Sequence, residues 1–335
     1  MNPEEKLEIL KKDSLELVGE EELLKVMKER VPKSYWGIAP TGPPHIGYYR
    51  TISKQIDLMK AGFEHTILIA NLHAYMDDRK APWEEINNRG EIYKKCLQLI
   101  GLEGKNITYK LGTEFQYNKE YYQELLKIMP YVTVKRATRA ASEVCRNMEE
   151  AKVSSLVYPL MQTLDCWALD CDLAYAGVDN RHVYMLSREA LPKIGHKKPA
   201  ILSTPLGLGL EGTGKMDASK AKARLELFAS EEDISKKINK AFCPEKQTKG
   251  NPVLEYLKYL VMQKKNRIII ERPEKFGGDL EIKNSEELYQ KFEEGEIHPM
   301  DLKNTTSKYL IEVLKPIRNY FEKNPDLLKT FEKEA

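Results

Sequence analysis

The sequence predicts an α/β fold in which a doubly wound parallel sheet carries a helical insertion and is followed by a mostly α-helical C-terminal domain. Three observations predict it. Short apolar runs alternate with helical patterns from Ser34 onward, as in strand–helix–strand units. The run at residues 66–70 is almost entirely apolar, which is typical of a strand buried on both faces of a parallel sheet. From about residue 230, helical patterns dominate.

Each element of the sheet region follows from a local pattern. Strands are predicted at residues 34–38, 66–70, 107–111 and 172–176. A helix follows the first strand, because apolar side chains recur there at a spacing of three or four residues, at Ile46, Tyr49, Ile52, Ile56 and Met59. Further helices are predicted at 84–100 and 181–192. Residues 199–214 are rich in Gly, Pro and Leu, which predicts a loop.

The chain of 335 residues exceeds the usual size of one domain. We predict a helical arm at 1–32, a sheet domain at 33–228 and a helical domain at 229–335. The sheet domain is expected to contain the helical insertion at about 118–157 and a loop at about 203–225. In the helical domain we expect a short β run at 267–270, a turn at 276–278 and a final helix that begins near Pro299.

The composition excludes several classes of protein. A net charge of +2 does not indicate that the protein as a whole binds a polyanion. Any contact with nucleic acid therefore needs local basic patches. The five cysteines are scattered, which predicts a reducing compartment, no disulfide framework and no metal site. No secretory leader is visible at Met1, and no apolar stretch reaches the roughly 18 residues of a membrane span. We therefore expect a cytoplasmic protein with no membrane partner.

The run His45-Ile46-Gly47-Tyr48 follows a predicted strand and a turn rich in Pro and Gly. This order places a helix N-terminus at the carboxyl edge of the sheet, where free N–H groups and the helix dipole favour phosphate. His45 can donate to a phosphate oxygen there, and Gly47 leaves room for a flat ring. Taken alone, the run is better explained as an ordinary helix start with His45 at the surface.

A second run, Lys215-Met216-Asp217-Ala218-Ser219, lies in the predicted loop. Lys215 can reach a triphosphate as a mobile cation, and Ser219 can hydrogen-bond an oxygen. Taken alone, this is a solvated loop lysine. The order of the two runs, their separation and their shared α/β setting favour a nucleotide site in two halves that activates a carboxylate.

Between these halves, Tyr158, Gln162 and Asp165 are spaced to share one face of a helix. Their neighbours are mostly apolar, so the segment is expected to be largely buried, and buried polar groups need partners. A bound zwitterion that carries a phenol would supply them. The alternative is a partly exposed helix face.

These motifs resemble a known family. The run from Pro40 to Gly47 and the pattern Lys215-Met216-x-x-Ser219 resemble the H-I-G-H and K-M-S-K-S signatures of class I aminoacyl-tRNA synthetases, whose catalytic domain is Rossmann-like. Further segments resemble the tyrosyl-tRNA synthetases of archaeal and eukaryotic type, at residues 35–37, 70–75, 80–84, 158–162 and 272–278. The resemblance covers about residues 4–325, and its motifs occur in family order.

The resemblance implies a tyrosine–tRNA ligase. Such an enzyme activates L-tyrosine with ATP to tyrosyl-adenylate and transfers it to the 3′ end of tRNA(Tyr), without a covalent enzyme intermediate. It also implies Mg²⁺ bound through the triphosphate, an anticodon-binding C-terminal domain, and a homodimer formed through the insertion. Alternatives are a tryptophanyl-tRNA synthetase, a non-catalytic RNA-binding paralogue and a small-molecule nucleotidyltransferase.

The resemblance also implies roles for individual residues. The implied catalytic residues are His45, Lys215 and Ser219. Those implied for ATP are Thr41, His45, Gly47, Asp179, Lys215 and Met216. Those implied for tyrosine are Tyr35, Gly37, His73, Gln116, Tyr158, Gln162, Asp165 and Asn180, with Tyr35 and Asp165 on the substrate hydroxyl. Those implied for tRNA are Arg139, Arg181, Phe276, His298 and Asp301. Without the resemblance, Arg139 is explained as part of a solvated basic face, Phe276 as a core ring and Asp301 as a helix cap.

Three positions depart from the family pattern. Tyr48 stands in place of the second signature histidine, as it often does in the eukaryotic branch. Asn180 replaces the usual Gln, which keeps the amide and shortens its reach. Asp217 replaces the usual Ser, and Ala218 replaces a Lys or a Ser. Asp217 therefore puts negative charge near the triphosphate. This last change favours the non-catalytic paralogue, whereas Tyr35 and Asp165 disfavour tryptophan because an indole has no hydroxyl.

Overall fold

The computed structural model describes residues 1–143, 151–214, 216 and 224–334 of the chain. The chain forms two compact units, and each is described by itself. Unit 1 comprises Met1–Gly42, Lys54–Leu97 and Leu102–Pro205, and unit 2 comprises Pro43–Ser53, Gln98–Gly101 and Leu206–Ala335. The domain boundaries expected from the sequence stay predictions.

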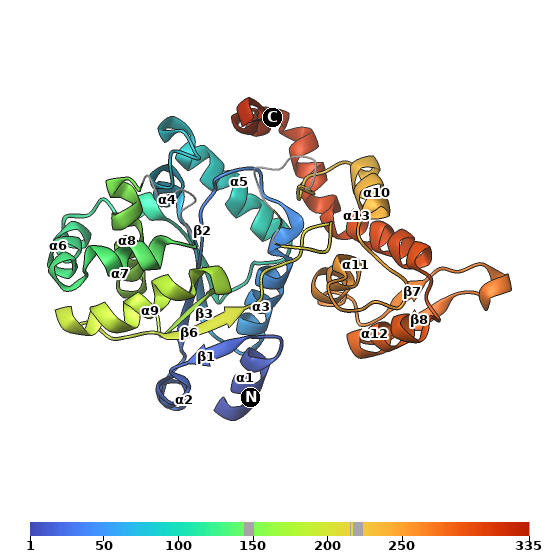
Figure 1. The fold of residues 1–335 in the computed structure, drawn as a ribbon, viewed down its shortest axis with the longest axis horizontal. Helices are drawn as coiled ribbons and strands as arrows, with labels where there is room; N and C mark the ends of the chain where they lie inside the picture. The colour runs from blue at the N-terminus through green and yellow to red at the C-terminus, as the bar shows by residue number, and fades with distance from the viewer. Residues whose placement is uncertain (144–150, 215, 217–223, 335) are drawn as a thin grey trace. The chain divides into compact units, whose positions relative to one another are not determined.

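Unit 1 is built on a six-stranded sheet with the strand order β1-β6-β5-β2-β3-β4 (Figure 1). Its strands are β1 (Glu16–Val18), β2 (Lys33–Ile38), β3 (Glu64–Ile69), β4 (Ile107–Leu111), β5 (Leu173–Gly177) and β6 (Ala200–Thr204). β1 is antiparallel to β6, and the other neighbouring pairs are parallel. The parallel α/β sheet is thus confirmed, and the four predicted strands correspond to β2, β3, β4 and β5.

Helices cover both faces of this sheet, with α8 and α9 on one face and α5 on the other (Figure 1). The helices that precede β6 in the chain are α1 (Pro3–Lys11), α2 (Glu20–Glu29), α3 (Tyr49–Lys60), α4 (Asn71–Met76), α5 (Ile86–Leu99), α6 (Lys119–Ile128), α7 (Val134–Ala141), α8 (Val153–Ala168) and α9 (Arg181–Ala190). The predicted helical insertion is confirmed as α6, α7 and the start of α8. A 3-10 turn at Met129–Tyr131 interrupts it at Pro130, a residue that lacks the N–H needed for a regular helical hydrogen bond.

The chain order of the strands reverses between β2 and β5. β3 and β4 continue the sheet beyond β2, whereas β6 continues it beyond β5. Parallel strands whose connections diverge from such a point leave a crevice at their carboxyl ends, where ligands bind. β2 reaches this edge at Gly37 and Ile38, and the 3-10 turn Val178–Asn180 follows β5 there.

Two strands escape local prediction. The sequence predicts a loop at 199–214, and this is wrong for Ala200–Thr204, which forms β6 and pairs with β5 on one side and β1 on the other. β1 lies in the arm that the sequence predicts as helical. Both strands are short, and their stability comes from partners distant in the chain, so a local pattern carries little signal for them.

Unit 2 is mostly helical, as predicted. Its helices are α10 (Glu231–Lys240), α11 (Pro252–Tyr256), the π-helical segment Leu257–Val261, α12 (Ser285–Glu294) and α13 (Pro299–Lys323). The hairpin of β7 (Ile268–Ile270) and β8 (Leu280–Ile282) matches the predicted β run. Its turn contains Gly277 and Gly278, whose φ angles of 97° and 69° favour glycine. α13 begins at the predicted Pro299.

Short 3-10 segments complete the secondary structure, at Ile46–Tyr48, Trp83–Glu85, Gly112–Glu114, Leu191–Ile194, Glu274–Phe276 and Pro325–Glu334. Across the ranges that the structure describes, we find no helix with the length and apolar character needed to cross a bilayer.

A buried carboxylate ties the amino ends of the parallel strands together. Asp172 directly precedes β5, and its side chain is 3% exposed. It accepts hydrogen bonds from Arg30 at 2.7 and 2.8 Å, from the Lys33 N–H at 2.8 Å and from Lys197 at 2.9 Å. Burial alone would raise the pKa of Asp172, but the hydrogen bonds from Arg30, Lys33 and Lys197 outweigh it and lower the pKa.

We expect Asp172→Asn to lower the free energy of unfolding by about 2 kcal/mol at pH 7, since it leaves Arg30 and Lys197 without a shared anion. A carboxyl with a lowered folded pKa contributes stability above its unfolded pKa, and loses it as the pH falls through the folded value. Urea unfolding at several pH values should therefore show the difference shrink in acid. Asp326→Asn, which removes a carboxylate 82% exposed, is the control. A difference that stays constant into acid would contradict this account.

Candidate active site

Asp165 lies at the centre of a buried polar cluster in unit 1. Helix α8 places Tyr158, Gln162 and Asp165 on one face, as the spacing predicts, and Asp165 is 1% exposed. Its carboxylate accepts hydrogen bonds from the Gln116 amide at 2.9 Å and from the Tyr121 hydroxyl at 2.8 Å. Three elements therefore converge on this group: α8, α6 and the segment that follows β4.

The environment of Asp165 changes its chemistry. Burial raises the pKa of Asp165 to about 7. The hydrogen bonds from Gln116 and Tyr121 favour the ionised form and lower the pKa, but burial has the larger effect. Near neutral pH the group can therefore act as a charged acceptor or as a protonated donor. A carboxyl balanced in this way is suited to bind a hydroxyl group, which can both donate and accept.

Tyr35 on β2 is also buried, at 1% exposure. Its hydroxyl lies 3.4 Å from the Gln162 carbonyl oxygen and 3.9 Å from Cys166 Sγ. Burial, with smaller effects from Cys166, Tyr184 and Asp165, raises the pKa of Tyr35 well above its ordinary value, so it remains a neutral phenol. Among the described residues, Asp165 takes its hydrogen bonds from Gln116 and Tyr121 rather than from Tyr35.

His73 and Tyr158 line the same region. Their rings meet edge to face with centroids 4.5 Å apart, and His73 Nδ1 lies 3.4 Å from the Gln116 amide nitrogen. Burial lowers the pKa of His73 to about 4, so its ring is neutral at physiological pH. Gly37 on β2 is half-buried, and a Cβ there would meet no atom closer than the Tyr35 ring at 3.6 Å.

Three buried polar atoms in this cluster lack a hydrogen-bond partner among the residues that the structure describes. They are His73 Nε2, Gln116 Oε1 and Gln162 Oε1. Buried polar atoms are normally paired, so a group of orphaned ones on adjacent elements points to a polar ligand.

Asn180 and Asp179 extend the cluster to the loop after β5. The Gln162 amide donates to Asn180 Oδ1 at 3.1 Å, and the Asn180 amide donates to Asp179 Oδ1 at 3.1 Å. The shorter side chain of Asn180 thus still reaches Gln162. This links α8 across the strand-order reversal to the residues that follow β5.

A second set of polar residues positions Gln116. Asn71 is fully buried, and its amide donates to Asn87 at 2.6 Å and to the Thr113 hydroxyl at 2.9 Å, while its carbonyl oxygen accepts from the Thr113 N–H at 3.1 Å. A Cβ on Gly112 would lie 2.5 Å from Gln116 Oε1. The segment after β4 is therefore fixed closely around this amide.

Tyr121 is the member of the cluster that the sequence does not predict. It lies on α6, 44 residues before Asp165, within an insertion whose sequence shows only helical periodicity. A buried tyrosine hydroxyl normally has a partner, but the identity of that partner depends on how α6 packs against α8.

In unit 2, the first signature begins at His45, which caps the 3-10 turn Ile46–Tyr48. Its Nδ1 accepts from the Gly47 N–H at 3.2 Å, which places the proton of a neutral ring on Nε2. The ring is 4% exposed and stacks on Tyr48 with centroids 4.4 Å apart. A Cβ on Gly47 would lie 2.8 Å from Cβ of Met216, so only glycine allows this close approach.

The flank of the second signature pairs with the first. The Ile46 N–H donates to the Leu225 carbonyl at 2.8 Å, and the Leu227 N–H donates to the Pro44 carbonyl at 3.0 Å. The described segment that follows the second signature is thus joined to the first signature by a short stretch of backbone pairing. Lys215, Asp217, Ala218 and Ser219 lie outside the described residues.

Thr41 precedes this signature and belongs to unit 1. There the turn is held by α5, because Arg89 donates to the Thr41 carbonyl at 3.2 Å and the Tyr93 hydroxyl donates to the Gly42 carbonyl at 2.8 Å.

The residues implied for tRNA acceptor-stem contact lie on α7 and α9 of unit 1. Arg139 is exposed on α7. Arg181 is the first residue of α9 and is ion-paired with Glu16 of β1, with Nη2 and Oε2 3.2 Å apart.

The residues implied for the anticodon lie at two turns of unit 2. Phe276 is 62% exposed after β7, and His298 caps α13 by accepting from the Met300 N–H at 3.2 Å. Arg272 connects the two turns, since it donates to the Gly278 carbonyl at 2.8 Å and to the Glu296 carbonyl at 2.7 Å. Asp301 is half-buried in the first turn of α13.

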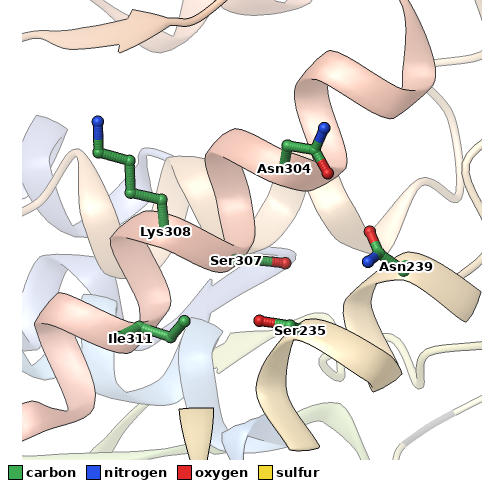
Figure 2. A pocket seen from close by; sticks show the side chains of 6 residues that line it. All are labelled: Ser235, Asn239, Asn304, Ser307, Lys308 and Ile311. Atoms are coloured by element: carbon green, nitrogen blue, oxygen red, sulfur yellow. The ribbon is translucent and has the colours of Figure 1, made fainter. Parts of the chain in front are cut away.

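A groove of about 400 Å³ lies between α10 and α13 of unit 2 (Figure 2). It is lined by Ser235, Asn239, Asn304, Ser307, Lys308 and Ile311. This lining contains no carboxylate and no histidine, so the groove lacks the groups that acid–base chemistry needs. The buried cluster around Asp165 is therefore the better candidate.

The chain is similar to known proteins over nearly its whole length. The model of a family described as tRNA synthetases class I (W and Y) matches residues 27–315. Tyrosine–tRNA ligase of Methanococcoides burtonii is 41% identical over 319 residues, which covers 95% of this chain and 100% of that protein. The corresponding ligase of Haloarcula marismortui is 40% identical over 336 residues, covering 98% and 97%. The crystal structure of tyrosyl-tRNA synthetase complexed with L-tyrosine from Archaeoglobus fulgidus has a TM-score of 0.89 and 38% identity, covering 95% of this chain and 99% of that one.

The raised pKa of Asp165, about 7, predicts how stability depends on pH. The folded protein holds this proton more tightly than the unfolded chain does. Protonated Asp165 therefore stabilises the folded state in acid, and this contribution is lost as the pH rises through 7. We expect Asp165→Asn to be more stable than the wild type at pH 8, by about 1–3 kcal/mol, and to differ less at pH 5. Thermal unfolding at both values measures this, with the exposed Glu120→Gln as control. If the stability of Asp165→Asn relative to the wild type were lower at pH 8 than at pH 5, this explanation would be contradicted.

Proposed function

The chain belongs to the class I tRNA synthetases of the W and Y type, and on that premise we propose that it is a tyrosine–tRNA ligase. The observation that carries the proposal is the buried Asp165, which is held by Gln116 and Tyr121 and which contributes to the raised pKa of the buried Tyr35 phenol. Such a group can bind the hydroxyl of a free tyrosine, whereas phenylalanine would add no hydrogen bond to those from Gln116 and Tyr121.

Tyrosine binding uses the whole cluster. Asp165 and Tyr35 bind the substrate hydroxyl. The orphaned Gln162 Oε1 is an acceptor suited to the substrate ammonium, together with Tyr158 and Asn180. His73 and Gln116 line the pocket, and Gly37 leaves space for the ring against β2.

Tryptophan fits this cluster less well. An indole offers one N–H donor and no acceptor, so it would satisfy Asp165 and leave the Tyr35 hydroxyl without a ligand partner. The curated relatives described above are tyrosine–tRNA ligases, which also favours tyrosine.

The reaction has two steps. A carboxylate oxygen of tyrosine attacks the α-phosphorus of ATP, the bond to the β-phosphate breaks, and pyrophosphate leaves. The terminal ribose hydroxyl of tRNA(Tyr) then attacks the carbonyl carbon of the adenylate, AMP leaves with the bonding electron pair, and the hydroxyl proton passes to a phosphate oxygen of the departing AMP. The nucleophile of the first step is already ionised, so catalysis is mainly positioning and electrostatic stabilisation.

His45 is assigned to the triphosphate because the hydrogen bond that its Nδ1 accepts from Gly47 places the proton of a neutral ring on Nε2. Lys215 and Ser219 act from the second signature. Thr41, Gly47, Asp179 and Met216 bind the remainder of ATP, which enters as its Mg²⁺ complex.

Contacts with tRNA(Tyr) are assigned to two regions. Arg139 and Arg181 contact the acceptor stem, where guanidinium groups suit base edges and phosphates. Phe276 and His298 stack on an anticodon base while Asp301 accepts from a guanine edge. The 62% exposure of Phe276 supports this, because a base can reach an exposed ring; the Lys275 ammonium also lies over this ring, 4.9 Å from its centre.

A cytoplasmic homodimer formed through the insertion is the assembly we propose. Large apolar side chains are unusually exposed in this part of unit 1, by 50–78%, at Tyr117, Tyr122, Leu126, Tyr131, Val134 and Val153. Exposed apolar side chains that concentrate in one region favour a protein interface.

The decisive test is ATP–pyrophosphate exchange with tyrosine, tryptophan and phenylalanine in parallel. We expect exchange with tyrosine alone. Tyr35→Phe should lower kcat/KM for tyrosine by about 10-fold or more, because Asp165 then binds the substrate hydroxyl without its neighbour. Tyr122→Phe, at an exposed phenol, should not change it. Exchange with tryptophan and not with tyrosine would overturn the proposal.

The homodimer predicts a second result. Leu126→Arg should shift the protein from dimer to monomer in analytical ultracentrifugation, because it buries a charge in the proposed interface. Leu15→Arg is the matched control, since Leu15 is 55% exposed outside the insertion and Leu126 is 50% exposed within it. A wild-type protein that sediments as a monomer would contradict the proposed assembly.

A further inference from the structure

Unit 2 contains a buried polar cluster to which the proposed chemistry assigns no role. We call it the Glu255 cluster, and it consists of Tyr49, Arg50, Glu255, Tyr256 and Tyr259. Tyr49 and Tyr256 are fully buried, Glu255 is 7% exposed, and the Arg50 side chain is 15% exposed. A buried ion pair is costly unless its geometry is good, so its presence here calls for a reason.

Glu255 on α11 binds the two residues that directly follow the first signature. The Tyr49 hydroxyl donates to Glu255 Oε2. Arg50 binds both carboxylate oxygens, with Nε 3.1 Å from Oε2 and Nη2 2.5 Å from Oε1. Paired contacts of this kind fix the orientation of a side chain as well as its position.

Arg50 is held on its other side by Tyr259. Its Nη1 donates to the Tyr259 hydroxyl at 3.1 Å, and the guanidinium carbon lies 4.7 Å from the centre of that ring. Tyr259 belongs to the π-helical segment Leu257–Val261, and π-helical turns occur frequently at functional sites.

The cluster also fixes the start of the loop that leads to the second signature. The Leu208 N–H donates to the Tyr49 hydroxyl at 2.7 Å, and the Leu208 carbonyl accepts from the Tyr256 hydroxyl at 3.3 Å. Both polar backbone groups of Leu208 are therefore held by the cluster. Lys215 follows Leu208 by seven residues.

Gly207 brings this loop onto the first signature. A Cβ there would lie 2.4 Å from the Gly47 carbonyl oxygen and 2.8 Å from the Tyr49 ring, so the loop backbone rests directly on both residues. Tyr49 thus contacts the carboxylate, the first signature and the loop toward the second.

We propose that Glu255 is a positioning residue for adenylate formation. It fixes the first signature through Tyr49 and Arg50. It also fixes the loop that leads toward Lys215, through Tyr49. The inference rests on the proposed function, because it requires that the signatures bind ATP. The tyrosine cluster lies in unit 1, so loss of Glu255 should impair the use of ATP and spare the binding of tyrosine.

The test is Glu255→Gln, measured by ATP–pyrophosphate exchange at saturating tyrosine. We expect kcat/KM for ATP to fall by about 10- to 100-fold, as small displacements of catalytic groups do, with an unchanged Kd for tyrosine by isothermal titration calorimetry. The matched control is Glu231→Gln, which breaks another ion pair of unit 2, between Glu231 and the 93% buried side chain of Arg318, 2.7 Å apart. It should lower the melting temperature and leave kcat/KM for ATP unchanged.

Tyr49→Phe provides a second measurement. It keeps the ring and removes the hydroxyl shared by Glu255 and Leu208, so it should reduce the use of ATP in the same way. The double variant should lose less than the sum of the two single losses, because both act through one contact. If Glu255→Gln yields no folded protein, Tyr49→Phe and Tyr256→Phe, which each lose a single hydroxyl, carry the test.

The outcomes separate the two proposals. Wild-type ATP kinetics in Glu255→Gln and Tyr49→Phe would overturn the role of Glu255 alone, as would an equal loss in tyrosine affinity. A wild-type protein without tyrosine-dependent exchange would overturn the proposed function, and this inference with it.

Discussion

The candidate site depends on one constraint, which is that a carboxyl group buried near the C-terminal end of α8 must find hydrogen-bond donors inside the protein. Gln116 and Tyr121 supply them. The Gln116 N–H donates to the Gly112 carbonyl at 2.9 Å, the Asn71 amide holds Thr113 of the same segment, and Tyr121 reaches Asp165 from α6. Much of the local structure between β4 and α8 therefore follows from the need to satisfy Asp165.

Two of the buried acids, Asp165 and Glu255, illustrate different uses of burial. Asp165 has neutral donors and no ion-pair partner among the described residues, and its pKa is raised to about 7. Glu255 has the guanidinium of Arg50 on both oxygens. An acid without a counter-charge retains the capacity to bind a ligand, whereas a fully paired acid serves to hold its neighbours in place.

The sheet topology explains why the ligand-facing residues come from separate stretches of the chain. The order of strands reverses between β2 and β5, so Tyr35 and Asn180 border the same crevice although 145 positions separate their numbers. α8 lies on the sheet face beside them and supplies Gln162 and Asp165. The contact between Gln162 and Asn180 is the direct link between these elements.

Some features follow from the sequence alone. The apolar runs specified β2 to β5, the spacing of Tyr158, Gln162 and Asp165 specified a shared helix face, and Pro299 marked the start of α13. In each case the signal is local, because helix and strand periodicity report which side chains share a face. The signature runs around His45 and Lys215 were also recognisable, since short motifs keep their spacing in the chain.

Only the tertiary structure decided the pairings between distant residues. Tyr121 meets Asp165 across 44 residues, and Tyr49 meets Glu255 across 206. β6 exists as a strand because β5 and β1 lie on either side of it. No periodic pattern encodes such partners, because they are set by how whole helices and strands pack, and a buried polar side chain shows in the sequence only that it needs a partner, not which one it has.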